Sequence, residues 1–79
     1  MSIIKSPDHY SKWAIEPITF IMGNGLSFWA GNVIKYTVRA GSKHYVGMTS
    51  DESEITDLKK ARRYIDMRLN QLEGKAIND

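Results

Sequence analysis

The chain has 79 residues, no cysteine and a formal net charge of +2 at neutral pH. A chain of this length forms one small domain with little interior, and without cysteine neither disulfides nor thiolate metal sites can reinforce it. We therefore predict a single domain over residues 1–79 that is reinforced by homo-oligomerisation. No apolar run approaches the length of a membrane span and the first residues lack the pattern of a signal peptide, so we expect a cytoplasmic protein that does not enter a membrane.

The positive charge is concentrated in the first part of the chain. Residues 1–50 contain five basic and two acidic side chains, whereas residues 51–75 contain six of each. The basic excess therefore belongs to the part of the chain that also holds most of the aromatic residues. The overall excess is small for a protein that binds duplex DNA, and no recognition helix is evident, so DNA binding is disfavoured.

Proline and glycine divide the first 25 residues. Pro7 disfavours helix in the residue before it, which predicts an extended arm over residues 1–12. Pro17 suits the first turn of a helix, where its missing N–H is not needed, and Gly23-Asn24-Gly25 predicts a turn. We expect a helix of about two turns between the arm and this turn.

Residues 26–40 follow a helical period. Ser27 is a suitable N-cap, and Gly41 is a suitable residue just past the C-terminal end. Asn32, Lys35 and Arg39 recur at helical spacing on the polar face. The opposite face carries an apolar stripe of Trp29, Val33, Tyr36 or Thr37, and Ala40. The β-branched residues of this segment would also suit a strand, but the spacing of the polar positions favours a helix.

A long C-terminal helix is expected to begin near Ser50 or Ser53 and to end at Gly74. Acidic residues crowd its first turns, where the helix dipole favours negative charge. We expect its apolar stripe to lie in the intramolecular core, with Trp29 and Leu58 as core positions and a second subunit as the alternative cover. The stripe consists of Ile55, Leu58, Ala61 or Arg62, Ile65, Leu69 and Leu72. The predicted fold is all-α: two shorter helices and one long C-terminal helix after an extended arm.

The polar face of the middle helix is the first candidate binding site. Asn32, Lys35 and Arg39, with Lys43 just beyond the helix end, supply several donors that suit an anionic ligand. Tyr36 or Tyr45 could stack on a base. The alternative is a solvated face whose cations interact with the C-terminal end of the helix dipole.

A second polar line, Asp57, Lys60 and Tyr64, follows the helical period of the C-terminal helix. This line could form part of a binding site, or its charged side chains could simply pair with others one helical turn away. The pair Glu54 and Asp57 is similar to the carboxylate pairs that bind Mg²⁺ in all-helical nucleotide pyrophosphohydrolases. Those sites need a further carboxylate cluster, and only two acids occur in the first fifty residues, so no complete metal site is predicted.

His9 is the candidate for general acid–base chemistry or phosphate contact, with an exposed arm residue as the alternative. No Gly-rich loop that could cradle phosphates occurs anywhere in the chain, because Gly23-Asn24-Gly25 is too short. Catalytic candidates are therefore limited to His9 and Asp57.

Four blocks together resemble a small domain of tailed bacteriophages. They are Pro7-x-His9-Tyr10, then Glu16-Pro17-Ile18-x-Phe20-Ile21, then Phe28-x-x-Gly31-Asn32-x-Ile34-Lys35-Tyr36-x-x-Arg39-Ala40-Gly41-x-Lys43, and Asp57-Leu58-x-Lys60-Ala61-x-x-Tyr64-Ile65. The resemblance covers about residues 7–66. Relatives of that domain are a phage protein that makes its host sensitive to an abortive-infection system and part of a phage nucleotide kinase that lacks a P-loop.

The resemblance implies a phage protein of the host cytoplasm that binds a nucleotide or phosphate. It further leads us to expect nucleoside monophosphate kinase-like activity, with Mg²⁺ carried by the nucleotide. The alternative is a non-catalytic anti-defence effector that sequesters a nucleotide signal or binds a host defence protein. The expected ligand-binding residues are Tyr10, Asn32, Lys35, Tyr36, Arg39, Lys43, Lys60 and Tyr64.

Overall fold

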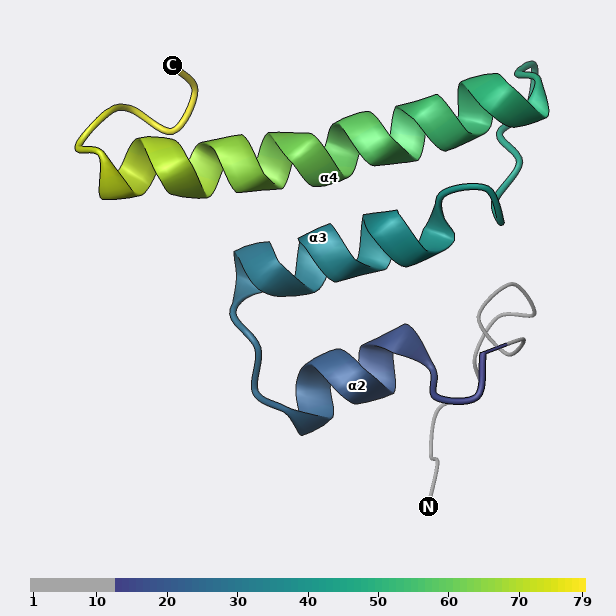
Figure 1. Cartoon of the computed structure of the whole chain (residues 1–79), viewed down its shortest axis with the longest axis horizontal. Coiled ribbons are helices and arrows are strands. Elements are labelled where there is room, and N and C mark those ends of the chain that lie inside the picture. Colours follow the sequence, from purple (N-terminus) through teal and green to yellow (C-terminus); the bar gives the residue numbers. More distant parts are fainter. Residues whose placement is uncertain (1–12) are drawn as a thin grey trace.

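The computed structural model describes residues 13–79, which form three α-helices and no strand. The helices are α2 (Pro17–Gly23), α3 (Phe28–Arg39) and α4 (Ser50–Leu72). Figure 1 shows them side by side in one layer, with α3 between the other two. The Cα atoms span only 16 Å along the shortest axis of the molecule. The predicted all-α class is thus confirmed, whereas the predicted arm, with His9 and Tyr10, lies outside the described residues.

Local sequence signals set the helix ends. Pro17 occupies the first turn of α2, as predicted. The Ser27 side chain caps α3 by accepting a hydrogen bond from the backbone N–H of Ala30 at 3.3 Å. At the start of α4, Thr49 and Glu52 form a reciprocal capping box with bonds of 3.1 and 2.8 Å. The beginning of α4 at Ser50 agrees with one of the two expected positions.

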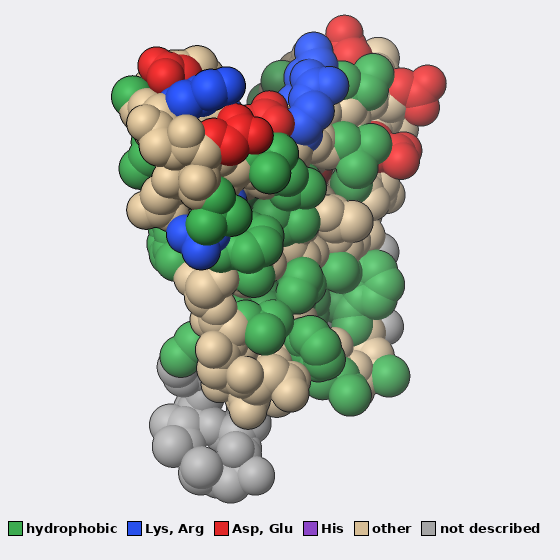
Figure 2. Space-filling view, turned by 60° about the vertical axis from the view of Figure 1, so that its left-hand side comes forward, with side chains coloured by type: hydrophobic (Ala, Val, Ile, Leu, Met, Phe, Trp, Pro, Cys, Tyr) green, Lys and Arg blue, Asp and Glu red, His purple; other side chains and the backbone are tan. Residues whose placement is uncertain are grey.

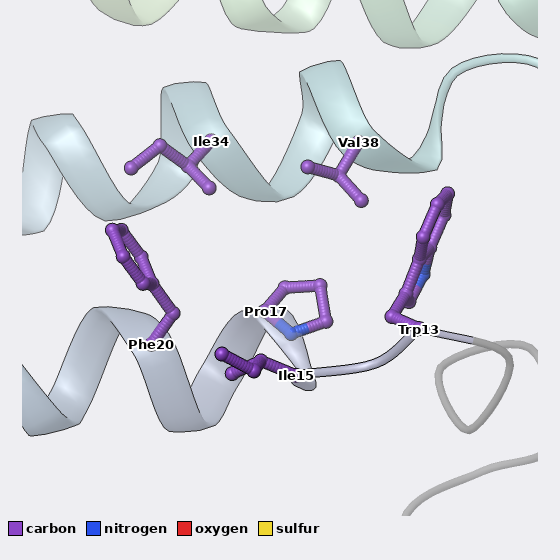
Figure 3. Close-up of a pocket in the computed structure, with 6 residues that line it drawn as sticks. All are labelled: Trp13, Ile15, Pro17, Phe20, Ile34 and Val38. Carbon is purple, nitrogen blue, oxygen red and sulfur yellow. The ribbon is translucent and has the colours of Figure 1, made fainter.

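The contact between α2 and α3 depends on a glycine. Gly31 is buried, and a Cβ placed there would lie 2.8 Å from Cγ2 of Ile21. Only a residue without a side chain permits so close an approach. Towards the N-terminal end of α2 an open hollow of about 320 Å³ lies between the two helices, lined by the uncharged residues Trp13, Ile15, Pro17, Phe20, Ile34 and Val38 (Figure 3).

The packing of α4 reverses the expected orientation. Its buried positions are Ser53, Asp57 and Ala61, so the helix meets α3 with its small and polar residues. The predicted apolar stripe instead remains 41–65% exposed at its Ile and Leu positions. The expectation that Leu58 and Trp29 are core positions is wrong for the single chain, since they are 44% and 38% exposed. The reason is the Arg39 side chain on the neighbouring face of α3. It is only 11% exposed, and a cation buried this far is stabilised by a carboxylate such as Asp57 and not by leucine.

A single layer of helices leaves apolar side chains in contact with solvent. In Figure 2 hydrophobic side chains gather across the middle and lower parts of one face, while most charged ones lie along the top, at the height of α4. The exposed apolar residues of α2 and α3 include Ile18, Met22 and Phe28. Within residues 13–79, no helix is both long enough and apolar enough to cross a bilayer.

Candidate functional site

The predicted polar residues of two helices meet at the interface between α3 and α4. We call this group the basic cluster; it comprises Lys35, Tyr36 and Arg39 of α3, Lys43 and Tyr45 of the following loop, and Asp57 and Lys60 of α4. Asn32 does not join it, because its side-chain amide donates a hydrogen bond of 2.8 Å to the carbonyl of Phe28 in its own helix. His9 and Tyr10 lie outside the described residues.

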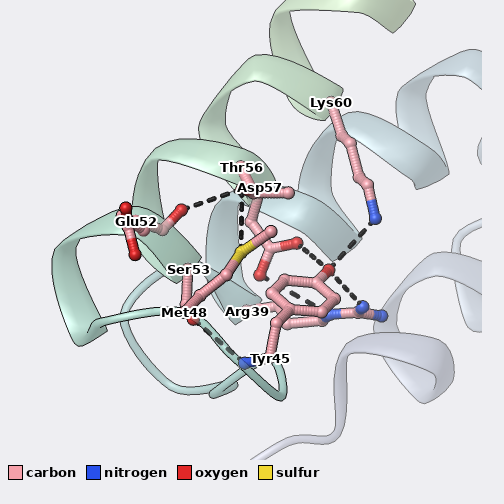
Figure 4. Close-up of polar contacts among 8 residues, drawn as sticks. All are labelled: Arg39, Tyr45, Met48, Glu52, Ser53, Thr56, Asp57 and Lys60. Atoms are coloured by element: carbon pink, nitrogen blue, oxygen red, sulfur yellow. Dashed lines mark hydrogen bonds and ion pairs between the residues drawn. The ribbon is translucent and has the colours of Figure 1, made fainter.

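The hydroxyl of Tyr45 stands at the centre of the basic cluster (Figure 4). It accepts hydrogen bonds from Nη2 of Arg39 at 2.7 Å and from Nζ of Lys60 at 3.1 Å. It donates to Oδ1 of Asp57 at 2.5 Å. One hydroxyl group therefore ties the end of α3, the loop and α4 together, and all three of its partners are charged groups, which make the stronger kind of hydrogen bond.

The carboxylate of Asp57 is completely buried, and its Oδ2 lies 3.6 Å from Nε of Arg39. The Arg39 side chain is only 11% exposed. The Arg39 guanidinium is therefore largely enclosed beside Asp57 instead of lying open on the polar face, and its contact with a ligand stays a prediction. Because a buried carboxylate without a cation is strongly destabilising, the first role of Arg39 is to neutralise Asp57 within the fold.

Three lysines surround the tyrosine rings. The ammonium group of Lys60 lies 4.9 Å from the ring centre of Tyr45 and 5.3 Å from that of Tyr36. Lys43 lies 5.1 Å from the Tyr45 ring, and Lys35 lies 5.1 Å from the Tyr36 ring. These are cation–π distances. None of the three lysines forms an ion pair with a carboxylate of residues 13–79, so the cluster carries uncompensated positive charge.

The aromatic rings are already in contact with other groups. Tyr36 and Tyr64 stack with ring centres 5.9 Å apart and planes inclined by 11°, and Phe28 meets the Tyr64 ring edge-on. Arg39 also lies 5.3 Å from the Tyr36 ring and 5.6 Å from the Tyr45 ring. A base could stack on Tyr36 or Tyr45 only after one of these cations had moved. The geometry therefore supports contact with phosphate better than stacking with a base.

Glu54 and Asp57, which resembled a metal-binding carboxylate pair but were not predicted to form a complete metal site, do not face a common position. Asp57 is directed to Arg39 and Tyr45, while the carboxyl carbon of Glu54 lies 3.6 Å from the position that a Cβ on Gly41 would take. No group of three or more His, Cys, Asp or Glu residues suited to a metal ion occurs within the described part of the chain.

Sequence reasoning missed the central position of Tyr45. It was considered only as a stacking surface, yet its hydroxyl joins the network and its backbone N–H donates a 2.9 Å hydrogen bond to Oγ of Ser53. Both partners are on α4, 8 and 12 residues further along the chain. No helical period could reveal them, because Tyr45 lies in the irregular segment between α3 and α4.

Comparison with known proteins identifies the family but not an activity. The chain belongs to the DUF3310 family of proteins of unknown function, whose sequence pattern matches residues 4–66. That range includes every member of the basic cluster. Neither the curated proteins nor the solved structures contain a significant match.

Proposed function

We propose that this domain binds a nucleotide or a related phosphate-bearing ligand through the basic cluster, and that Lys35, Lys43 and Lys60 contact its phosphates. The observation that carries the proposal is the gathering of three ammonium groups around two tyrosine rings, with no carboxylate of residues 13–79 paired to any of them. Like charges gathered around the same two rings repel one another, and an anion bound among them would relieve that repulsion.

The burial of Asp57 favours binding without turnover. Phosphoryl transfer needs groups that position a metal ion or a nucleophile beside the phosphate. Asp57 was a catalytic candidate, but its carboxylate has no exposed surface and is engaged by Tyr45 and Arg39. The second candidate function, a non-catalytic phage effector that sequesters a nucleotide signal, therefore fits the cluster better than a kinase-like enzyme does.

A thermal-shift series separates the parts of the ligand. A nucleoside, its monophosphate, its triphosphate and inorganic triphosphate are each added to the protein at several salt concentrations. We expect no shift with the nucleoside and the largest shift with the triphosphates, by roughly 10 °C or more at a hundredfold excess over Kd. Equal shifts with nucleoside and triphosphate, or none with any of them, would contradict the proposal.

Matched variants locate the site. Lys35→Gln and Lys43→Gln each remove one ammonium group of the basic cluster, whereas Lys75→Gln removes one from an exposed position outside it, after the end of α4. We expect the first two to weaken triphosphate binding about tenfold each, since a hydrogen bond to a charged group contributes about 1.5–3 kcal/mol. The control is expected to bind as the parent does. Recovery of the nucleotide unchanged after prolonged incubation distinguishes sequestration from turnover.

A further inference from the structure

The exposed apolar stripe of α4 repeats with alternating steps of three and four residues. Its positions are Ile55, Leu58, Arg62, Ile65, Leu69 and Leu72. This is the heptad pattern of a coiled coil, with Ile55, Arg62 and Leu69 as the first core position of successive heptads and the other three as the second. In the single chain the fully buried positions of α4 are Ser53, Asp57 and Ala61, on another side of the helix, and the Ile and Leu side chains of the stripe stay 41–65% exposed.

The C-terminal segment leaves the stripe open. After α4 the chain turns back along the helix (Figure 1), and its hydrogen bonds go to Arg63 and Asn70. Arg63 donates to the side chain of Asn78, and Asn70 donates to the carbonyl of Ile77. Both positions lie beside the stripe rather than within it, because each follows a core position by one residue.

We propose that the stripe is the docking surface for α4 of a second copy of this chain, which pairs with it as an antiparallel two-stranded coiled coil. Among residues 13–79 the buried side chains are limited to Pro17, Ser53, Asp57 and Ala61, and the helices form a single layer. A stable domain needs a second packed layer, and a second copy supplies a stripe of identical period. The inference is independent of any ligand of the basic cluster.

Arg62 weighs against a parallel arrangement of the two helices. In a parallel pair in register, the two Arg62 side chains would face each other in the middle of an apolar seam, which like charges oppose. In an antiparallel pair each Arg62 faces Ile65 of the second copy. The remaining layers then pair Ile55 with Leu72 and Leu58 with Leu69. The exposed flanking residues Lys59 and Asp66 of opposite copies approach each other, and their charges attract.

Sedimentation analysis of the full chain and two variants tests the surface. Ile65→Lys adds a second cation from each copy to the centre of the seam, four in the dimer with the two Arg62 side chains, whereas Val46→Lys makes the same chemical change at a fully exposed loop residue outside it. We expect the parent and Val46→Lys to be dimers at micromolar concentration, and Ile65→Lys to dissociate with a Kd raised at least about a hundredfold, or 2.7 kcal/mol. A parent that stays monomeric up to about 100 μM overturns the proposal, as does an unaffected Ile65→Lys dimer.

Disulfide formation tests the orientation even if Ile65→Lys fails to fold, because the chain has no cysteine of its own. In the antiparallel pair Leu58 lies opposite Leu69 of the second copy, while the two Leu58 residues are about 17 Å apart along the axis. Mixing Leu58→Cys with Leu69→Cys should therefore yield the crossed disulfide dimer, and neither variant alone should crosslink. Crosslinking of Leu58→Cys by itself, or no crosslinking of the mixture, refutes the antiparallel pair.

Discussion

Removing the Tyr45 hydroxyl tests whether the basic cluster holds the fold together. Tyr45→Phe keeps the ring but deletes the group that bonds Arg39, Lys60 and the buried carboxylate of Asp57. Lys60 can turn to solvent, so its lost bond costs little, but Asp57 and Arg39 lose a partner in a place that water reaches poorly. At about 1.5–3 kcal/mol for a bond to a charged group, we expect a destabilisation of about 2–4 kcal/mol.

That loss is a large part of the roughly 4–12 kcal/mol available to a chain of this length, and it corresponds to a fall in Tm of about 10–30 °C. Urea and thermal denaturation followed by circular dichroism measure it. Tyr36→Phe is the matched control, because the Tyr36 hydroxyl has no hydrogen bond to another side chain of residues 13–79 while its ring stacks on Tyr64. If Tyr45→Phe costs less than about 1 kcal/mol, the network does not carry the stability assigned to it.

Two further substitutions test the helix contacts. Gly31→Ala should destabilise the protein by about 1–3 kcal/mol, because the new methyl group would meet Ile21 at 2.8 Å; an unchanged or raised Tm would show that α2 can move away at no cost. Thr49→Ala should cost about 1 kcal/mol through loss of the capping box, whereas Ser50→Ala, one residue along, should cost little; equal losses in urea denaturation would refute the assignment of Thr49 as the cap.

The helices could be predicted because their signals are local. Pro17, Ser27 and Gly41 mark ends through their own backbone preferences, and the structure places all three as expected. The pattern Thr49-x-x-Glu52 was also available as a capping box and would have fixed the start of α4 without the ambiguity between Ser50 and Ser53.

The orientation of α4 could not be predicted from its period. A helical period states which residues share a face, but not which face meets which neighbour. Hydrophobicity alone assigns Leu58 to the core and Asp57 to solvent, whereas the structure buries Asp57 and exposes Leu58. The deciding interaction is with Arg39, a residue on another helix, and that partner becomes visible only when the helices are packed.

In the candidate site, too, the sequence predicted which residues belong together but not which of them are buried. That Lys35, Arg39 and Lys60 belong to one group was predicted from their blocks in the sequence, and the structure brings them around the same two rings. The separate roles of the arginine and the lysines could not be predicted, because they depend on how far each side chain is buried once the helices have packed. Arg39 is committed to a buried carboxylate, while the lysines keep their charge available.

Lys60 connects the structural part of the cluster to its proposed binding surface. An ammonium group has three N–H donors, and the Tyr45 hydroxyl takes one of them at 3.1 Å. The remaining donors can meet a phosphate without breaking that bond, so ligand binding need not weaken the network around Asp57. Arg39 has less freedom, since its guanidinium lies against Asp57 and Tyr45 and is almost fully buried. For this reason loss of Arg39 should first appear as a loss of stability, whereas loss of Lys35 or Lys43 should appear as a loss of affinity in a folded protein.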